Sequence, residues 1–227
     1  MVMRSSFTTT CRRRIRRVDL RLVLLGLALT AVCGVAAGAR ERIVPARESL
    51  EAKLLYCNTC HGLQAEGYRG YLPMPRLAGQ QAQYTESQLR AFIERRRTNP
   101  IMANVAHVLT PSMISDLAKY YQNLNPRPIG GTPRRSLAQG KEIFDNGLPD
   151  SNVPACSVCH GAEAKGKGEN PRLAGQLYEY TVDQLTKWAK VRGQGTTVDT
   201  SAIMAPTAHN LTRAQIETVA AYVSYLK

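Results

Sequence analysis

Apolar side chains recur every three or four positions in four segments of the chain, with polar residues between them. This spacing places the apolar side chains on one face of a helix. No segment shows the apolar and polar alternation of a strand, so the pattern predicts an all-α protein. The four apolar sets are Leu89, Phe92 and Ile93; Ile114, Leu117, Tyr121 and Leu124; Leu185, Trp188 and Val191; and Ile216, Val219, Ala220 and Val223.

Polar residues in front of these segments predict where the helices begin. Thr85 and Thr181 are each followed by Gln three positions later, which is the spacing of a capping box. Thr110 stands before Pro111, and Thr212 also has a Gln three positions later. We therefore expect two helices to start at Thr85 and Thr181, and the last helix of each half to start after Thr110 and Thr212.

The first forty residues follow a different pattern. A run rich in Arg is followed by an uncharged apolar stretch over residues 22–39. This order is typical of an export signal, and Ala37-Gly38-Ala39 offers a small-residue cleavage site. The same stretch is long enough for a marginal transmembrane anchor. On either interpretation, residues 1–39 place the rest of the protein outside the cytoplasm.

The remaining sequence contains an internal repeat of two copies. PRLAGQ occurs at 75–80 and again at 171–176, followed in both cases by a Tyr and a Gln-Leu pair. A Pro- and Gly-rich stretch over 126–133 cannot continue a helix and separates the two copies. The sequence thus predicts one domain over 40–125, a linker over 126–133 and a second domain over 134–227. Each domain is small, so each needs a staple or a ligand in its core.

Each copy contains one C-x-x-C-H motif, with a predicted helix running into it. Two Cys three positions apart face the same side of a helical turn, and the following His lies on that face as well. This is the attachment signature of c-type haem, in which the His binds the iron. A zinc site or a redox disulfide is the weaker alternative. The predicted attachment residues are Cys57, Cys60 and His61, and Cys156, Cys159 and His160.

The sixth iron ligand must come from elsewhere in each copy. Met102 and Met204 stand in matched sequence contexts before the last helix, and we expect them in loops where the thioether completes His/Met coordination. His107 and His209 follow five positions later and are the alternative ligands. Met74 is a poorer candidate, because the second copy has an Asn at the corresponding position.

Other repeated residues fit the surroundings of a haem. The carbonyl groups of Pro75 and Pro171 are predicted to accept the Nδ1 proton of the proximal His. Repeated Arg and Tyr side chains suit the binding of haem propionates. They are Arg76, Arg172, Tyr84 and Tyr180, together with Arg96 and Arg192.

The net charge of the chain indicates which classes of molecule it could bind. The chain has 30 Lys and Arg against 17 Asp and Glu, a formal net charge of +13. Seven Arg and one Asp fall within residues 1–39, so the remainder carries +7. This modest excess on an exported protein excludes nucleic acid and favours acidic protein patches or anionic lipid. The run Arg95-Arg96-Arg97 provides the first candidates for a docking surface.

Taken together, these motifs resemble the dihaem cytochrome c4 group of class I c-type cytochromes. The resemblance covers nearly all of residues 48–227 and rests on the two haem motifs, the doubled PRLAGQ, the two Met segments and a last helix ending near a Tyr. It implies two cytochrome c domains related by a pseudo-two-fold axis, with haem propionates near the domain interface. His61 with Met102, and His160 with Met204, match the axial ligands of that family.

The resemblance also implies a function. It is electron transfer in the periplasm of a Gram-negative bacterium, from a quinol-oxidising bc complex to a haem-copper terminal oxidase or a reductase. Two irons with both axial positions filled leave no place for a small-molecule substrate, so we expect no enzyme activity. The alternatives are a cytochrome subunit of a larger dehydrogenase or oxidase complex and a dihaem peroxidase, which requires one open iron.

Overall fold

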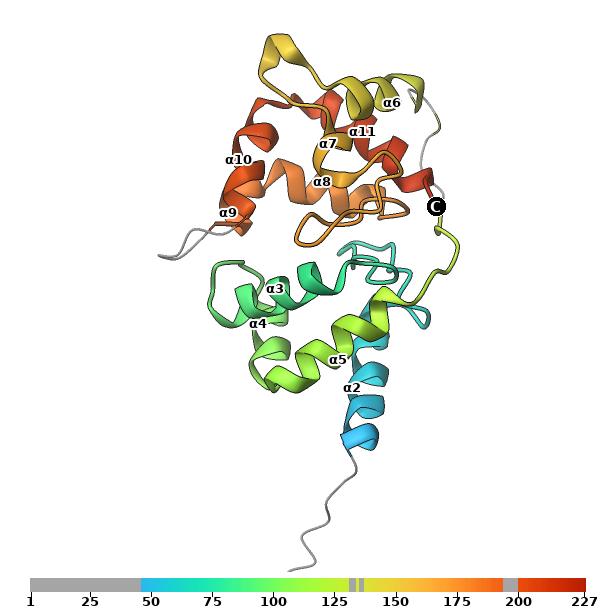
Figure 1. Ribbon diagram of the computed structural model, residues 1–227, viewed down its shortest axis with the longest axis vertical. Helices are drawn as coiled ribbons and strands as arrows, with labels where there is room; N and C mark the ends of the chain where they lie inside the picture. The colour runs from blue at the N-terminus through green and yellow to red at the C-terminus, as the bar shows by residue number, and fades with distance from the viewer. Residues whose placement is uncertain (1–45, 131–133, 135–136, 194–199) are drawn as a thin grey trace, which may run out of the picture. The chain divides into compact units, whose positions relative to one another are not determined.

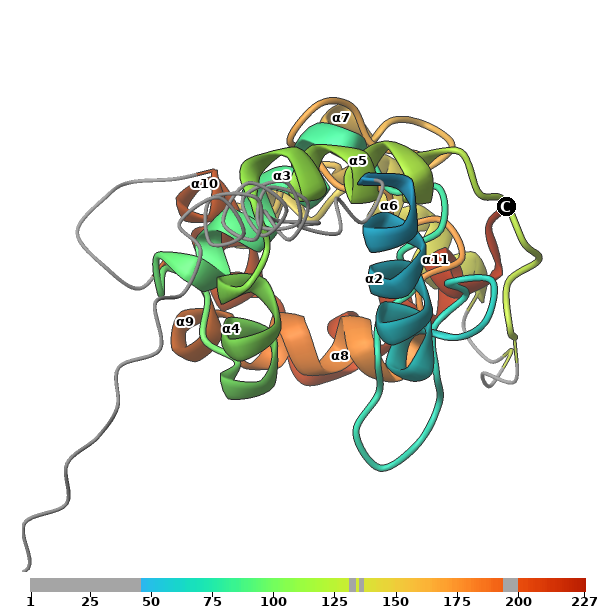
Figure 2. The same cartoon turned by 90° about the horizontal axis from the view of Figure 1, so that it is seen from below.

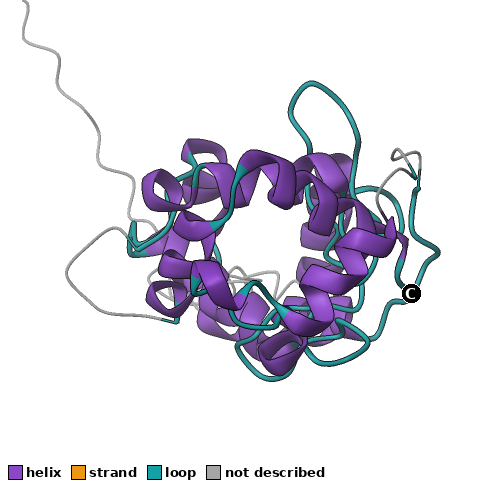
Figure 3. Cartoon of the chain, turned by 90° about the horizontal axis from the view of Figure 1, so that it is seen from above, coloured by secondary structure: helices purple, strands orange, loops and turns teal. Residues whose placement is uncertain are grey.

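The computed structural model describes residues 46–130, 134, 137–193 and 200–227, and Pro45–Lys227 forms one compact unit. In the described residues the secondary structure is helical, apart from isolated β-bridges such as that between Tyr68 and Met74 (Figure 3). This confirms the predicted all-α class. The predicted export signal or anchor lies outside the described residues. Within them, no helix has the length and apolar character needed to cross a membrane.

The first copy builds its core between its last helix and the helices before it (Figure 1). The last helix, α5, packs against α2 and α3, and α3 also packs against α4. As the spacing predicted, Ile114, Leu117 and Tyr121 are buried, each at most 3% exposed. The helices are α2 (Ala46–His61), α3 (Ala82–Ile93), α4 (Pro100–His107) and α5 (Pro111–Gln122).

The second copy repeats this arrangement with more interruptions. Its last helix, α11, packs against α6 and α8, and the predicted apolar face at Ile216, Val219, Ala220 and Val223 is buried. The predicted helix through Trp188 is divided into α8 and α9. The elements are α6 (Leu137–Asn146), η1 (Pro149–Ser151), α7 (Cys156–His160), α8 (Tyr178–Thr186), α9 (Trp188–Val191), α10 (Ser201–Asn210) and α11 (Arg213–Tyr225).

The two haem motifs are reached differently. In the first copy α2 runs without a break to His61, whereas in the second copy α6 ends at Asn146 and α7 is a separate short helix. Gly147 makes the break with a φ of 71°. A Cβ there would lie 2.4 Å from the carbonyl oxygen of Val153, so only glycine fits this turn.

Two of the four predicted helix starts are confirmed by the structure. Thr110 and Thr212 are N-caps, and Thr212 forms the full capping box with Gln215. The predictions for Thr85 and Thr181 were wrong, because α3 and α8 begin three residues earlier. The hydroxyl groups of both Thr donate to a carbonyl group four residues back, at Gln81 and Leu177. A Thr inside a helix satisfies its hydroxyl in this way and then gives no start signal.

The PRLAGQ segments close the long loop that follows each haem motif. Gly79 donates its backbone N–H to the carbonyl group of Tyr121, and Gly175 does the same to Val223. Both glycines have φ near 70°, at 75° and 71°. The loop of the first copy extends away from the helices (Figure 2), and Tyr71 within it is fully exposed. Each repeated segment is thereby fastened to the last helix of its own copy.

Candidate haem-binding site

The proximal histidines stand at the ends of α2 and α7. The Nδ1 atom of His61 donates to the carbonyl oxygen of Pro75 at 2.9 Å, and that of His160 donates to Pro171 at 2.8 Å. Both imidazoles are buried, at 7% and 4% exposed. The predicted hydrogen bonds to the proline carbonyl groups are confirmed. With the proton held on Nδ1, Nε2 carries the lone pair that binds a metal.

Burial sets the charge of these imidazoles. It lowers the pKa of His61 and His160, although the bond to the proline carbonyl partly opposes this shift in each case. The positive charge of Arg97 further lowers the pKa of His61. Both side chains are therefore neutral at neutral pH, which is the form that coordinates iron.

The cysteines are arranged for thioether attachment. None of Cys57, Cys60, Cys156 and Cys159 forms a disulfide, and the second Cys of each motif is exposed. Burial raises the pKa of the Cys57 thiol, and it raises that of Cys156 to about 11. These two first cysteines pack against the cores of their own copies. The first Cys of each motif would therefore hold a haem beside the core, and the second would hold it nearer the surface.

The two methionines lie in helices, so the loop prediction was wrong. Asn99 caps α4 by accepting the backbone N–H of Met102 at 3.0 Å, and Pro100 occupies the first turn. Asn followed by Pro is a strong helix start, which places Met102 inside the first turn. Met204 lies in α10, which continues through Pro206.

In α4 and α10 the candidate Met and the alternative His lie on different faces of the helix. Met102 is four residues before Ala106, which is 0% exposed, and Met204 is four residues before Ala208, which is 6% exposed. Residues four apart share a helix face, so both methionines lie on the side of the more buried residues, and both are half-buried. His107 and His209 are exposed and lie one residue further, rotated by about 100°.

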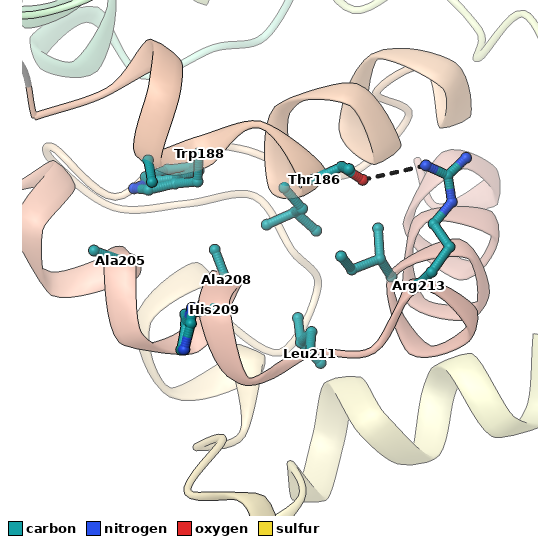
Figure 4. Close-up of a pocket in the computed structure, with 10 residues that line it drawn as sticks. Thr186, Trp188, Ala205, Ala208, His209, Leu211 and Arg213 are labelled. Atoms are coloured by element: carbon teal, nitrogen blue, oxygen red, sulfur yellow. Dashed lines mark hydrogen bonds between the residues drawn. The ribbon is translucent and has the colours of Figure 1, made fainter.

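The second copy has an apolar pocket beside the Met204 helix. It has a volume of about 270 Å³ and lies between α8, α9, α10 and α11. Figure 4 shows Trp188 on one side and α10, with Ala205, Ala208 and His209, on the other. Arg213 lies at its edge and donates to the hydroxyl of Thr186 at 3.4 Å. Its lining includes His209 but neither Met204 nor a residue of the C-x-x-C-H motif, so the pocket does not itself define the haem site.

Arg76 and Arg172 are buried where the two copies meet, at 3% and 9% exposed. The Nε atom of each donates to the carbonyl oxygen two residues ahead at 3.0 Å. Burial, followed by the charge of Arg172, lowers the pKa of Arg76 to about 10, so it stays charged at neutral pH. No hydrogen-bond partner is found among the described residues for the buried Nη1 of Arg76. An unused donor on a buried cation is suited to an acidic group, as the predicted propionate role requires.

Two glutamines that the sequence reasoning did not select join the copies. Gln80 accepts the backbone N–H of Arg172 at 2.7 Å and donates to its carbonyl oxygen at 3.1 Å. Gln176 makes the same pair of bonds with Arg76, at 2.9 and 3.0 Å. Both side chains are 7% exposed. The only signal for them was their place at the end of the doubled PRLAGQ.

A second polar cluster brings Tyr84 and Tyr180 to the same interface. Arg97 donates to the hydroxyl of Tyr180 at 2.6 Å, and Arg192 donates to that of Tyr84 at 3.5 Å. Both guanidinium groups also share the side-chain oxygens of two glutamines, which therefore lie between them. These glutamines are Gln88 and Gln184.

The predicted match of Arg96 with Arg192 was wrong, because Arg97 takes that place. Arg96 instead pairs with Glu94 at 2.7 Å. Arg95 adopts the left-handed conformation with a φ of 59°, which absorbs one extra residue at the end of α3. Arg97 then stacks on Phe92 with its guanidinium carbon 4.5 Å from the ring centre, as Arg192 stacks on Trp188 at 5.1 Å.

The residues fit a haem in each copy. A neutral buried imidazole offers Nε2, two thiols lie on the same helical face, and a half-buried Met lies in a helix of the same copy. Buried guanidinium groups at the interface suit acidic substituents. When bound, haem supplies a one-electron couple, and the chain supplies ligands, orientation and charge.

Comparison with known proteins agrees with this chemistry. The family model described as Cytochrome c matches residues 51–125 and 137–227. The chain therefore belongs to the cytochrome c family, and each of its two cytochrome c domains carries a covalently bound haem c. Its relatives include cytochrome c-552 of Acidithiobacillus ferridurans, 37% identical over 91% of this chain and 88% of the relative.

A solved cytochrome c4 structure and a second named relative are also similar to the chain. The structure of Acidithiobacillus ferrooxidans cytochrome c4 is 36% identical, with a TM-score of 0.62 over 75% of this chain and 98% of that one. A protein of Thiomonas intermedia named thiosulfate dehydrogenase electron acceptor is 35% identical over 74% of this chain and 77% of its own length. The protein is a dihaem electron carrier of the cytochrome c4 type.

Proposed function

We propose that the protein carries electrons in the periplasm, from a quinol-oxidising bc complex or a similar donor to a terminal oxidase or reductase. His61 with Met102, and His160 with Met204, are the axial ligands in this proposal. The observation that carries it is that each copy holds a buried imidazole whose Nδ1 donates to a proline carbonyl group, and a half-buried Met at a matched position of a helix. Two iron sites closed in this way transfer electrons and bind no small-molecule substrate.

The ligand assignment is tested by replacing each Met with Ala. His107→Ala and His209→Ala are matched controls, because each removes the alternative ligand from the same helix. Met102→Ala and Met204→Ala should each abolish half of the thioether-to-iron charge-transfer band. Each should also open one iron to cyanide and lower the potential of that haem, because Met ligation raises it. If the band persists in the Met variants and disappears in the His variants, the wrong partner has been assigned.

A second candidate is a subunit that accepts electrons within a larger dehydrogenase complex. The printed name of the Thiomonas relative favours it, since that protein accepts electrons from a thiosulfate dehydrogenase. Affinity purification from the native membrane and soluble fractions separates the two candidates. Co-purification with a flavin, molybdenum, copper or further haem subunit indicates a complex, whereas recovery of the free dihaem chain indicates a mobile carrier. Fractionation also tests whether the N-terminal segment tethers it to the inner membrane.

The peroxidase alternative requires an iron that exchanges its sixth ligand. Carbon monoxide added to the reduced native protein measures this directly. We expect the visible spectrum to stay unchanged, because a Met fills each sixth position. A carbon monoxide adduct at one haem, together with peroxide turnover, would assign the protein to the peroxidases instead.

A further inference from the structure

One peptide group connects each proximal histidine to the opposite domain. The carbonyl oxygen of Pro75 accepts from Nδ1 of His61, and the N–H of the same peptide group belongs to Arg76. That N–H donates to Oε1 of Gln176 in the second domain at 2.9 Å. A continuous chain of hydrogen bonds thus runs from the imidazole through the peptide group to Gln176.

The second domain has the reciprocal chain. Nδ1 of His160 donates to the carbonyl oxygen of Pro171, and the N–H of that peptide group, on Arg172, donates to Oε1 of Gln80 at 2.7 Å. Each glutamine therefore serves the histidine of the domain to which it does not belong.

Local bonds hold both glutamines in place. Oε1 of Gln80 also accepts the backbone N–H of Gln81 at 3.0 Å, and Oε1 of Gln176 accepts that of Leu177 at 2.9 Å. The Nε2 group donates to the carbonyl oxygen of the opposite Arg. With donors and acceptor engaged in a buried site, the amide has one orientation. In the docked domains it is therefore a fixed acceptor.

Hydrogen bonds in a chain polarise one another. When a peptide N–H is bonded to an acceptor, electron density moves toward its carbonyl oxygen, and the bond that this oxygen accepts becomes stronger by about 10–30%. A stronger bond at Nδ1 makes the imidazole a better electron donor to the metal. Electron donation stabilises the oxidised iron, so the acceptor in the opposite domain lowers the potential of the haem.

We propose that Gln176 and Gln80 are positioning residues that each set the reduction potential of the haem in the opposite domain. The inference rests on the proposed function, because it takes His61 and His160 as iron ligands. Docking of the domains then does more than bring two haems together. It completes the hydrogen-bond chain behind each iron, so that each potential depends on the presence of the other domain.

The test replaces each glutamine with Met, which has a similar shape and no amide. In full-length protein with both haems, Gln176→Met should raise the potential of the first haem and leave the second unchanged, and Gln80→Met should do the reverse. At a fixed electrode potential the reduced-to-oxidised ratio of the affected haem should rise about 1.3-fold to fivefold. Spectroelectrochemical titration measures the potentials. NMR assigns each haem by the cysteines bonded to it.

Gln81→Met is the matched control. Gln81 also crosses the interface, where Nε2 donates to the carbonyl oxygen of Lys165 at 3.0 Å, but it touches neither proline peptide group. It should leave both potentials unchanged. The Nδ1 proton resonance of the reduced protein gives a second measurement, and it should move upfield only for the histidine opposite the substituted glutamine.

Gln176→Glu keeps the acceptor and strengthens it, so it should lower the potential of the first haem where Gln176→Met raises it. Equal shifts at both haems, a shift at the haem of the same domain, or no shift would overturn the proposal. A rise with both Met and Glu would also overturn it, by showing that packing is responsible. Failure of the ligand assignment is recognised separately, because the parent protein would then lack the NMR signals of His and Met bound to iron.

Discussion

The two domains reach the same histidine geometry through different loops. From His61 to Pro75 the first loop spans 14 positions, and from His160 to Pro171 the second spans 11, yet the closing hydrogen bonds are 2.9 and 2.8 Å. The first loop exposes Tyr71, whereas the second carries Lys and Glu side chains. Loop length costs little free energy, while the imidazole must meet one fixed geometry. The comparison shows that the length and sequence of the loop can vary, provided that the hydrogen bond between the His at its start and the Pro at its end is kept.

The domains also differ in how they reach the interface. In the first domain Arg97 arrives there after a left-handed turn at Arg95, whereas in the second domain Arg192 follows α9 directly. The loop of the first domain adds an ion pair, in which Nε of Arg69 donates to Glu179 at 3.0 Å. The two domains therefore make nearly the same hydrogen bonds across the interface, but different loops and helices carry the residues that make them.

The largest effect is expected from removing one haem at a time. Replacing Cys57 and Cys60 with Ser should leave one haem per chain, and replacing Cys156 and Cys159 should do the same. Each small domain packs its core around its haem, so the domain that loses the haem should also lose cooperative unfolding. Haem-to-protein ratios and circular dichroism measure both effects. Two haems retained in either variant would contradict the assignment of one motif to one haem.

Core truncations compare the stability of the two domains. Leu117→Ala should cost about 2–5 kcal/mol in the first domain, and Phe144→Ala about 3–5 kcal/mol in the second. Phe144 is 0% exposed and contacts the ring of Tyr222, with 5.6 Å between ring centres. Because buried hydrogen bonds join the domains, we expect one unfolding transition when denaturation is followed at both haems. Two separate transitions would show that the domains unfold independently.

A smaller difference should separate the two N-caps. Thr110→Ala and Thr212→Ala should each lower the free energy of unfolding by about 0.5–2 kcal/mol. The loss at Thr212 should be the smaller, because the bond from the backbone N–H of residue 212 to Gln215 at 2.8 Å survives the substitution and Thr110 has no such second bond. Chemical denaturation of the two variants against the parent checks the order. The reverse order would mean that the reciprocal bond adds no stability.

The smallest effect is expected at the basic run. Arg97 belongs to the interface and Arg96 pairs with Glu94, so Arg95 is the residue of the three that tests docking. Arg95→Gln should slow second-order electron transfer about twofold at low salt and leave it unchanged at physiological salt, where charges are screened over about 8 Å. Arg97→Gln is the contrast, because it should disturb the interface at any salt concentration. An equal salt response in both variants would place Arg97 on the docking surface.

Much of the site was readable from the sequence because it depends on local spacing. C-x-x-C-H places two thiols and an imidazole on one helical face wherever it occurs. The helical period predicted the buried faces of α5 and α11. The role of the Pro75 and Pro171 carbonyl groups was predicted from their place at the start of the repeated PRLAGQ. The helix starts at Thr85 and Thr181 were misjudged, because a Thr can satisfy its hydroxyl within a helix as well as at its end.

The contacts between the two domains could be seen only in the tertiary structure. The sequence analysis grouped Arg96 with Arg192 as propionate candidates, and only the structure, with its left-handed turn at Arg95, shows that Arg97 joins Arg192 instead. Gln80 and Gln176 carry no local signal, since an amide bonds equally well to water, to its own chain or to a distant peptide group. The sequence alone predicted the C-x-x-C-H motif of each domain and the buried face of its last helix, whereas the helices that carry Met102 and Met204 appeared only in the structure. Which side chain meets the opposite domain was decided by tertiary packing, because such partners are neighbours in space and not along the chain.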